Sequence, residues 1–354
     1  MTRRCILHIG MNKAGSTSLQ DAYQDYDDGQ TYYLPLQAPN HSAMMRMIFS
    51  KAAPKRFFYS DDAGARKDQT VALRQQLEDA LAADRRSVII SGEGMSSLKE
   101  PGSVSSVVSF LRARYDQVEG LCYVRDPAGY IASLFQQVLK TGAPSFNLDQ
   151  LFPKYQTRLT DWRDELGPDG LRFVAFHPDS LAGGDLLADF SARLHLSPLT
   201  EDRKPVRKNS SLSAEAVAVL FRYRNAKGPP KIRGPEKEAS RRLIRLLQSF
   251  GRGKLVLDQE EVARLSVKFK AELDWMQDHT EGQIVRQSEG LAAGSIAIAT
   301  EKQLLMLADN STPALREWVA TLHPKAGKLP QGTVELLDFL YQRELDPRSR
   351  IKRN

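Results

Sequence analysis

The residues near the N-terminus that could do chemistry are one lysine, two glycines and three hydroxyl side chains. Residues 5–9 form a short apolar run that is typical of a buried strand, and Gly10 interrupts it. Lys13 lies in the loop that follows, and Gly15 ends that loop. Three hydroxyl residues then favour the start of a helix: Ser16, Thr17 and Ser18. Because loop amides and a helix N-terminus stabilise negative charge, this stretch predicts a site for phosphate or sulfate.

The spacing in this stretch differs from that of the ATP and GTP phosphate loop. Gly10 and Gly15 are five positions apart, as in the motif G-x-x-x-x-G-K-[ST]. That motif requires a lysine directly after the second glycine, where this chain has Ser16. The lysine of this chain, Lys13, stands two positions before Gly15 instead. The spacing therefore favours a different kind of phosphate loop.

Residues 13–17 (KAGST) resemble the 5′-phosphosulfate loop of sulfotransferases that use 3′-phosphoadenosine 5′-phosphosulfate (PAPS). That family usually carries Lys-[Thr/Ser]-Gly-[Thr/Ser]-Thr, and its bacterial members have strand residues similar to 8–10 (HIG) before the loop. Ala14 departs from the pattern, since it replaces a common hydroxyl and removes one hydrogen bond to phosphate. The alternative without a ligand is a tight strand-to-helix turn with a surface lysine.

A second motif follows the predicted strand 118–124. Arg125 begins the sequence Arg-Asp-Pro, and Ser133 comes eight residues after it. This resembles the 3′-phosphate site of the same family, where a strand ends in Arg-(Asp/Asn)-Pro and a serine follows at that spacing. A guanidinium binds phosphate bidentately, and a hydroxyl early in a helix adds a donor. Without a ligand, Arg125 would pair with Asp126 or another acid, and Ser133 would be a small residue at a helix contact.

The two motifs together imply transfer of a sulfuryl group from PAPS, as co-substrate, to a hydroxyl or amine of a carbohydrate. The acceptor would be a surface polysaccharide or a glycolipid. The nucleotide-binding residues that the resemblance implies are Lys13, Ala14, Gly15, Ser16, Thr17, Ser18, Arg125 and Ser133. Lys13 would also act in catalysis, by neutralising the bridging and leaving oxygen. The reaction requires no metal, and the sequence has no cluster with metal-ligand spacing.

A hydroxyl acceptor also needs a general base, for which the sequence offers two candidates. Glu93 directly follows a predicted buried strand, 87–91, and two flanking glycines would let the backbone approach a ligand. His177 also follows a strand, and its intrinsic pKa suits proton transfer. The alternative for Glu93 is an ordinary acidic residue in a turn. We expect Glu93 to be the base and keep His177 as the second candidate.

Strands alternate with helices up to about residue 197, which predicts an α/β fold with a parallel sheet. The resemblance implies the P-loop, nucleotide-kinase-like architecture of sulfotransferases. It spans residues 3–280, with weaker likenesses at 89–94, 176–181 and 209–213. Beyond 197 the pattern predicts helices and no strand. We therefore expect a PAPS-binding domain over 1–280, including the helical region 197–280, and a linker with a helical extension over 281–354.

The charge of the chain is concentrated in one segment. The 354 residues carry a formal net charge of +7, whereas residues 203–254 hold 15 Lys or Arg and three acids. This segment suggests an electropositive rim for a polyanionic acceptor. Alternatively, its cations are solvated or pair with acids elsewhere in the chain. Nucleic acid is a weaker partner, because no aromatic platform is interleaved with the cations.

The remaining composition indicates an ordinary cytoplasmic protein. No apolar run is long enough to span a membrane, although peripheral membrane contact stays open. The start MTRRCILHIGM imitates a signal peptide, but its apolar run is too short. Cys5 and Cys122 lie in predicted buried strands and are expected to be reduced core thiols. The competing functions are a P-loop kinase that uses ATP and magnesium, and a non-enzymatic protein that binds polyanions. The sequence identifies neither the acceptor nor the oligomeric state.

Overall fold

The structure is a computed structural model in which most of the chain is described: residues 2–11, 14–84, 86–142, 145–200, 203, 211–231, 233–285 and 293–346. The chain forms two compact units. The first unit contains Met1–Pro127, Pro153–Arg207 and Phe269–Arg286. The second unit contains Ala128–Phe152, Lys208–Lys268 and Gln287–Asn354. These limits differ from the division after residue 280 that the sequence analysis expects, because helices from 214–247 pack on helices from 301–345.

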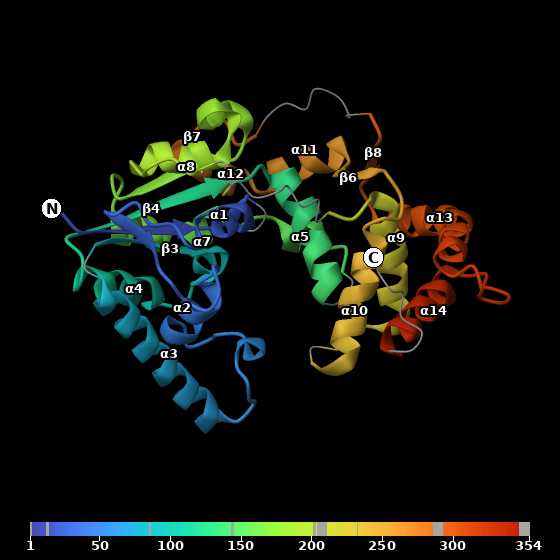
Figure 1. The fold of residues 1–354 in the computed structure, drawn as a ribbon. Helices are drawn as coiled ribbons and strands as arrows, with labels where there is room; N and C mark the ends of the chain where they lie inside the picture. Colours follow the sequence, from blue (N-terminus) through green and yellow to red (C-terminus); the bar gives the residue numbers. More distant parts are fainter. Residues whose placement is uncertain are drawn as a thin grey trace. The chain divides into compact units, whose positions relative to one another are not determined.

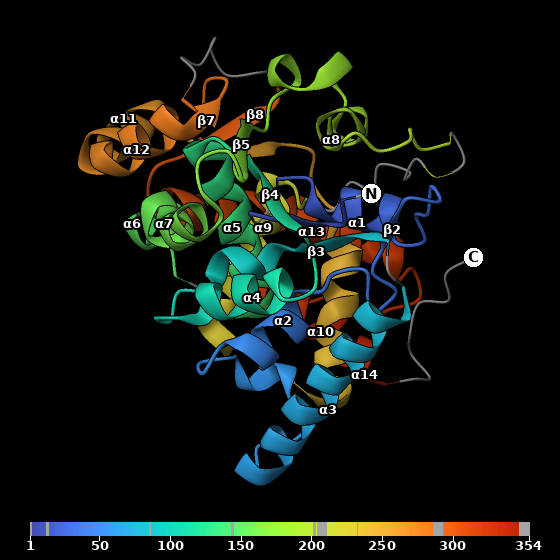
Figure 2. The ribbon, with the colours of Figure 1, turned by 90° about the vertical axis from the view of Figure 1, so that its left-hand side faces the viewer.

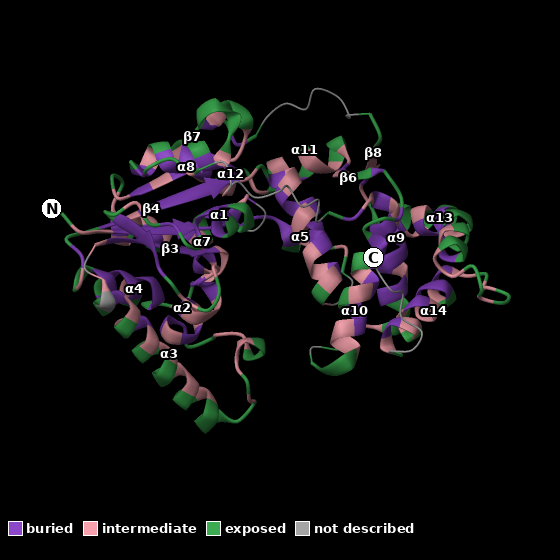
Figure 3. Cartoon of the chain, viewed as in Figure 1, coloured by how far each residue is buried: buried purple, intermediate pink, exposed green. Residues whose placement is uncertain are grey.

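The first unit is built on a six-stranded parallel sheet with the strand order β2-β3-β1-β4-β5-β7. The strands are β1 (Arg4–Ile9), β2 (Thr31–Tyr33), β3 (Ser87–Gly92), β4 (Gln117–Val124), β5 (Leu171–Ala175) and β7 (Thr280–Glu281). The central strands are almost completely buried, as expected of a parallel sheet that helices cover on both faces (Figure 3). The α/β class and the parallel sheet that the sequence predicts are confirmed.

Helices cover both faces of this sheet. The helices of the first unit are α1 (Ser16–Tyr23), α2 (Ser42–Phe49), α3 (Ala63–Ala83), α4 (Ser103–Arg112), α7 (Tyr155–Leu166), α8 (Leu186–Leu194) and α12 (Lys270–His279). Helix α1 packs on α8, and α4 packs on α7 and β4 (Figure 1). Helix α3 packs on α2 and extends away from the sheet, as Figure 2 also shows. Short 3₁₀ turns follow β3 at Glu93–Ser97 and β5 at Pro178–Ser180, and another lies at Lys55–Phe57.

The topology directs attention to the carboxyl ends of the strands. Strand β1 lies between β3 and β4 in the sheet. From β1 the chain continues to β2, on the β3 side of β1, whereas from β4 it continues to β5, on the side of β4 away from β1. The connections therefore diverge between β1 and β4. Ligands of open parallel sheets bind at such a divergence, outside the carboxyl ends of the strands.

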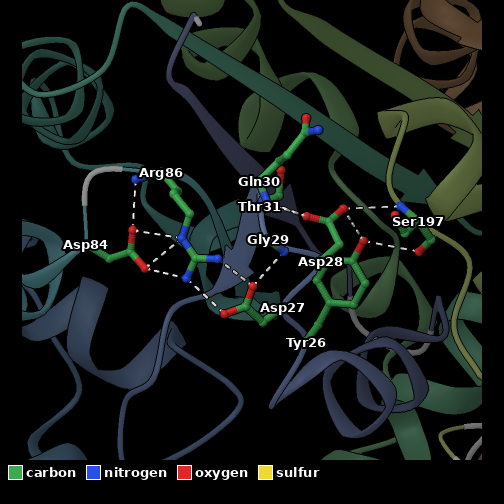
Figure 4. A network of polar contacts seen from close by, with 9 residues as sticks. All are labelled: Tyr26, Asp27, Asp28, Gly29, Gln30, Thr31, Asp84, Arg86 and Ser197. Atoms are coloured by element: carbon green, nitrogen blue, oxygen red, sulfur yellow. Dashed lines mark hydrogen bonds and ion pairs between the residues drawn. The ribbon is translucent and has the colours of Figure 1, made fainter.

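A network of ion pairs fixes the opposite edge of the sheet, where β2 and β3 begin (Figure 4). The two Nη atoms of Arg86 donate to the two carboxylate oxygens of Asp27, at 2.6 and 2.8 Å. The Nε of Arg86 also donates to Asp84, at 3.0 Å. Tyr26 Oη donates to Asp28, which in turn accepts from the amide of Thr31. This network holds the turn before β2 and has a structural role.

The second unit is mainly helical. Its helices are α5 (Pro127–Thr141, in this unit from Ala128), α6 (Leu148–Leu151), α9 (Ala214–Lys227), α10 (Gly234–Leu247), α11 (Gln259–Lys268), α13 (Glu301–Leu322) and α14 (Thr333–Leu345). Helix α9 is buried between α13 and α14, and α10 packs on α14. Two short strands, β6 (Lys254–Leu257) and β8 (Ser295–Ile298), pair in parallel.

The prediction that no strand follows residue 197 is therefore wrong. Strands β6, β7 and β8 have only two to four residues each, and each pairs with a strand distant in sequence. Such short strands carry too few side chains to show an alternating pattern. One long helix, α13, covers Glu301–Leu322 and has Pro313 in its interior.

Candidate functional site

The loop after β1 lies at the diverging edge of the sheet. Gly15 caps α1 with a left-handed backbone, at a φ of 78°. A Cβ atom on Gly15 would lie 2.2 Å from Leu186 Cδ2 and 3.1 Å from Phe176 Cε2, so only glycine fits. Ala14 is buried, and its amide donates to the carbonyl of Met11 at 3.3 Å. Asn12 and the predicted catalytic Lys13 lie outside the described residues.

The three hydroxyl residues occupy the first turn of α1. Ser16 is buried, and its Oγ is 3.5 Å from the carbonyl of Met11. Thr17 and Ser18 are exposed. The first intrahelical bond of α1 runs from the amide of Leu19 to the carbonyl of Gly15, so the three amides before it precede the helical ladder. The first turn contains no acidic residue, and it has the geometry of a helix N-terminus that can receive an anion.

Glu93 lies directly against this loop. Gly92, at the end of β3, is the register partner of Ile9, and its carbonyl accepts from the amide of Gly10 at 3.2 Å. The Cγ of Glu93 lies 3.2 Å from the position of a Cβ on Gly10. Ser96 Oγ donates to the carbonyl of Gly10 at 2.9 Å. The half-buried Glu93 is thus held beside the predicted anion site by the pairing of β1 with β3.

The glycines around Glu93 have a different role from the one expected. The amide of Gly94 donates to Ser42 Oγ at 2.7 Å. A Cβ on Gly94 would lie 2.8 Å from Ser42 Cβ and 3.0 Å from Arg46 Cδ, and one on Gly92 would lie 3.0 Å from Ser42 Oγ. The N-terminal turns of α2 therefore fill this space. The two glycines admit α2 and do not open the backbone to a ligand.

Arg125 follows β4, the strand next to β1. Its side chain is 31% exposed, and its Nε lies 4.0 Å from Asp126 Oδ2. Burial lowers the pKa of the Arg125 guanidinium, and Asp126 opposes this effect. Tyr155 Oη donates to the carbonyl of Arg125 at 2.8 Å and fixes the backbone there. Ser133 lies in α5 and is half-buried, but it belongs to the second unit and is not among the residues that this sheet positions.

His177 follows β5, and its imidazole caps a short turn. Nδ1 accepts from the amide of Asp179 at 3.3 Å and lies 3.5 Å from the Asp179 carboxylate. The side chain is 42% exposed. Phe176, one residue earlier, packs on Gly15. His177 therefore has a local capping role that the sequence analysis did not assign, whereas Glu93 contacts the loop itself.

A cluster of buried polar side chains that the sequence analysis does not predict lies beneath the loop. His8 Nδ1 lies 2.8 Å from Ser91 Oγ, which also accepts from Gln20 Nε2 at 3.1 Å. The amide of Ser91 donates to His41 Nδ1 at 3.2 Å. Burial lowers the pKa of both His8 and His41 to about 4, so both imidazoles are neutral at pH 7. The only signal in the sequence is His8 itself, a polar residue in an apolar strand.

Several cations of the basic segment are paired within the second unit. Arg241, Arg242 and Arg245 all lie 3.1–3.6 Å from Glu238, and Arg242 also contacts the buried Glu344 at 3.0 Å. Two further pairs are Arg222 with Asp309 and Lys227 with Asp338. Lys204–Ser210 lie outside the described residues. For the paired cations, the structure favours the alternative in which acids of the chain neutralise them.

Among the described residues, no group of three His, Cys, Asp or Glu side chains could hold a metal ion. Within the same described part of the chain, no helix has the length and apolar character needed to cross a membrane. Cys5 and Cys122 are buried free cysteines, and burial raises the pKa of both thiols. No protein-family model matches the chain, and no curated protein matches it either.

Proposed function

We propose that this protein is a sulfotransferase that moves a sulfuryl group from PAPS to a hydroxyl or amine of a carbohydrate. One observation carries the proposal. The loop that opens α1, the carboxylate of Glu93 and the guanidinium of Arg125 all follow adjacent strands at one edge of the sheet. An anion site, a base and a second cation are the groups that the transfer requires. We also propose that the first unit has the P-loop architecture of sulfotransferases.

Different residues of the chain would bind the two phosphate groups of PAPS and stabilise the leaving group. The first-turn amides of α1 and the hydroxyls of Ser16 and Thr17 would bind the 5′-phosphosulfate. Arg125 would bind the 3′-phosphate. Lys13 would neutralise the charge that develops on the leaving oxygen. Bound PAPS would supply the activated sulfur–oxygen bond.

The transfer itself balances as a single displacement. The acceptor oxygen forms a bond to sulfur, and the bond between sulfur and the phosphate oxygen breaks. Adenosine 3′,5′-bisphosphate leaves, and the proton of the acceptor hydroxyl moves to Glu93. We prefer Glu93 to His177 as the base, because Glu93 contacts Gly10 of the loop whereas His177 Nδ1 already accepts from Asp179.

Thermal unfolding with three nucleotides tests this function. Adenosine 3′,5′-bisphosphate should raise the melting temperature, since a ligand at about a hundredfold excess over its Kd stabilises the fold by about 2.7 kcal/mol. ATP with magnesium, and AMP, should raise it less. A larger shift with ATP and magnesium would instead support a kinase. If no nucleotide raised the melting temperature, the non-enzymatic polyanion-binding function would be favoured.

A further inference from the structure

A groove in the first unit has the composition of an anion site and lies at the far end of α2. Its volume is about 610 Å³, and it is lined by the end of α2, the segment before α3 and one side of α3. Five cations line it, namely Lys51, Lys55, Arg66, Lys67 and Arg74, and Arg74 is paired with Glu78 at 3.3 Å. None of its described lining side chains is acidic. A concave surface with this excess of positive charge attracts anions.

Arg66 gives this groove a specific anchoring point. Its Nη1 is buried and has no hydrogen-bond partner among the described residues. The guanidinium lies 6.0 Å from the ring centroid of Phe58, which also lines the groove. A buried guanidinium N–H without an acceptor is costly, and a carboxylate or sulfate oxygen would satisfy it. Arg66 is thus positioned to bind an anionic group.

Apolar and aromatic side chains complete the surface. Phe49 and Phe58 line the groove, and Val71 lines it while remaining 61% exposed. Tyr59 follows Phe58 and is 85% exposed, although its amide is held by Gln69 Oε1 at 3.1 Å. Sugar rings have apolar faces that stack on aromatic rings, and a charged sugar adds an anion beside them. The ring of Phe58 beside Arg66 therefore offers an aromatic face next to a cation, a combination that matches an anionic glycan.

Helix α2 links this groove to the candidate base. The amide of Gly94, next to Glu93, donates to Ser42 Oγ in the first turn of α2, whereas Phe49 ends the helix in the groove. Eight residues of helix span about 12 Å. Arg46 lies between the two ends, with its Cδ 3.0 Å from the position of a Cβ on Gly94. A short oligosaccharide could follow α2 from the groove to Glu93.

Positive charge continues along this path. The guanidinium of Arg46 lies 5.5 Å from the ring centroid of Phe57. Burial lowers the pKa of Arg46, Glu100 opposes this effect, and Arg56 and Arg158 lower the pKa further. Arg46 thus adds a cation between the groove and the turn that carries Glu93.

We infer that the groove between α2 and α3 binds an anionic segment of the glycan acceptor, with Arg66 holding a carboxylate or sulfate group. The inference rests on the proposed transfer to a carbohydrate and specifies its acceptor as an anionic glycan. It also places the acceptor contacts in the first unit and not in the 203–254 segment, where Arg241, Arg242 and Arg245 already form ion pairs with Glu238, and Arg242 also with Glu344.

Direct binding to the full chain tests this inference without requiring transfer. The probes are an oligogalacturonate, a sulfated galactose oligosaccharide, a neutral galactose oligosaccharide of the same length and vesicles of phosphatidylglycerol. At least one anionic oligosaccharide should bind more tightly than the neutral one, and its Kd should rise with salt. The two anionic probes show whether carboxylate or sulfate is preferred. Tighter binding to the vesicles than to either anionic oligosaccharide would overturn the inference in favour of a membrane surface.

Two variants locate the site. Arg66→Gln, and the double variant Lys51→Gln/Lys67→Gln, should each raise the Kd of the anionic oligosaccharide by about tenfold. The matched control is Lys302→Gln/Lys325→Gln, which removes the same charge from exposed lysines of the second unit and should leave the Kd unchanged. The double variant changes only exposed side chains, so it remains informative if Arg66→Gln fails to fold.

Equal effects of the double variant and its control would overturn the inference, since they would indicate a response to net charge alone. Adenosine 3′,5′-bisphosphate affinity is measured on the same proteins and should not change. If bisphosphate binds but no anionic oligosaccharide does, the groove inference fails while the proposed function stands. If neither binds, both fail.

Discussion

Glu93 lies against Gly10, with its side-chain Cγ 3.2 Å and its backbone Cα 3.0 Å from the position that a Cβ on Gly10 would take. The two residues come from neighbouring parallel strands, because Gly10 follows β1 and Glu93 follows β3. The contact joins the predicted anion loop to the proposed base. It also explains why a glycine stands at position 10, since any side chain would separate the two.

Substitution of Gly10 by alanine should therefore disturb both stability and nucleotide binding. The added methyl would lie 2.6 Å from Ser16 Oγ and 3.0 Å from Glu93 Cα, which forces a shift of α1 or of the turn after β3. We expect a loss of about 1–3 kcal/mol in the free energy of unfolding, measured with urea, and weaker binding of adenosine 3′,5′-bisphosphate. Gly327→Ala is the control, because nothing lies within 4 Å of its Cβ. Unaltered stability and affinity in Gly10→Ala would show that the contact is not tight.

Two substitutions distinguish Glu93 from His177 as the general base. Glu93→Gln should lower the turnover of PAPS by about 10²–10⁴-fold, the usual contribution of a general base, and leave the bisphosphate Kd near its original value. His177→Asn keeps an acceptor for the amide of Asp179 and should retain most of the turnover. Release of adenosine 3′,5′-bisphosphate from PAPS is the readout. The opposite pattern, with His177→Asn inactive and Glu93→Gln active, would make His177 the base.

The buried histidines predict a specific dependence of stability on pH. Their pKa is about 4 in the folded protein and about 6.5 in the unfolded chain. Below pH 6.5 the unfolded state binds more protons, so the free energy of unfolding should fall as the pH drops from about 6.5 to about 4. The loss should be about 2–3 kcal/mol for each histidine, measured by urea unfolding across this range.

Variants identify the source of this dependence. His41→Gln should remove about half of the slope between pH 6.5 and 4, and it retains a side-chain acceptor for the amide of Ser91. His177→Asn is the control, because it replaces an imidazole that is 42% exposed and lies outside the buried cluster. A slope that persists undiminished in His41→Gln would assign it to other groups.

The ion pairs of the second unit make a further prediction about the basic segment. Arg242 contacts both Glu238 and the buried Glu344, so Arg242→Ala should cost about 2–3 kcal/mol of unfolding free energy. Lys237→Ala removes a neighbouring cation of α10 and should cost much less. Neither variant should change the affinity for an anionic glycan. A weaker glycan affinity in Arg242→Ala, with normal stability, would return the acceptor site to this segment.

Sequence alone predicts the edge of the sheet at which the candidate residues gather. The strand ends at Gly10, Glu93 and Arg125 could be identified because each apolar run stops abruptly at a glycine or a charged residue. Parallel strands place such ends at the same edge, so their proximity follows from the class of fold. The order of the strands, and hence the contact of Glu93 with Gly10, needed the structure.

Other features depend on contacts between distant segments and leave no local pattern. Gly94 is small because α2 packs on it, and α2 lies about fifty residues earlier in the chain. His177 caps its own turn, a role that composition cannot distinguish from catalysis. The pairing of Arg242 with Glu344 joins residues 102 positions apart. Charge counted along the sequence therefore does not show which cations of the basic segment are paired with acids of the chain.

Calorimetry with adenosine 3′,5′-bisphosphate and AMP tests the central claim most directly, because the two ligands differ only in the 3′-phosphate that Arg125 is proposed to bind. The wild-type protein should bind the bisphosphate at least about tenfold more tightly than AMP. Arg125→Ala should lose about 1–3 kcal/mol of binding free energy for the bisphosphate and almost none for AMP. Equal affinities for the two ligands in the wild-type protein, or an unchanged bisphosphate affinity in Arg125→Ala, would contradict the assignment of this edge of the sheet as a PAPS site.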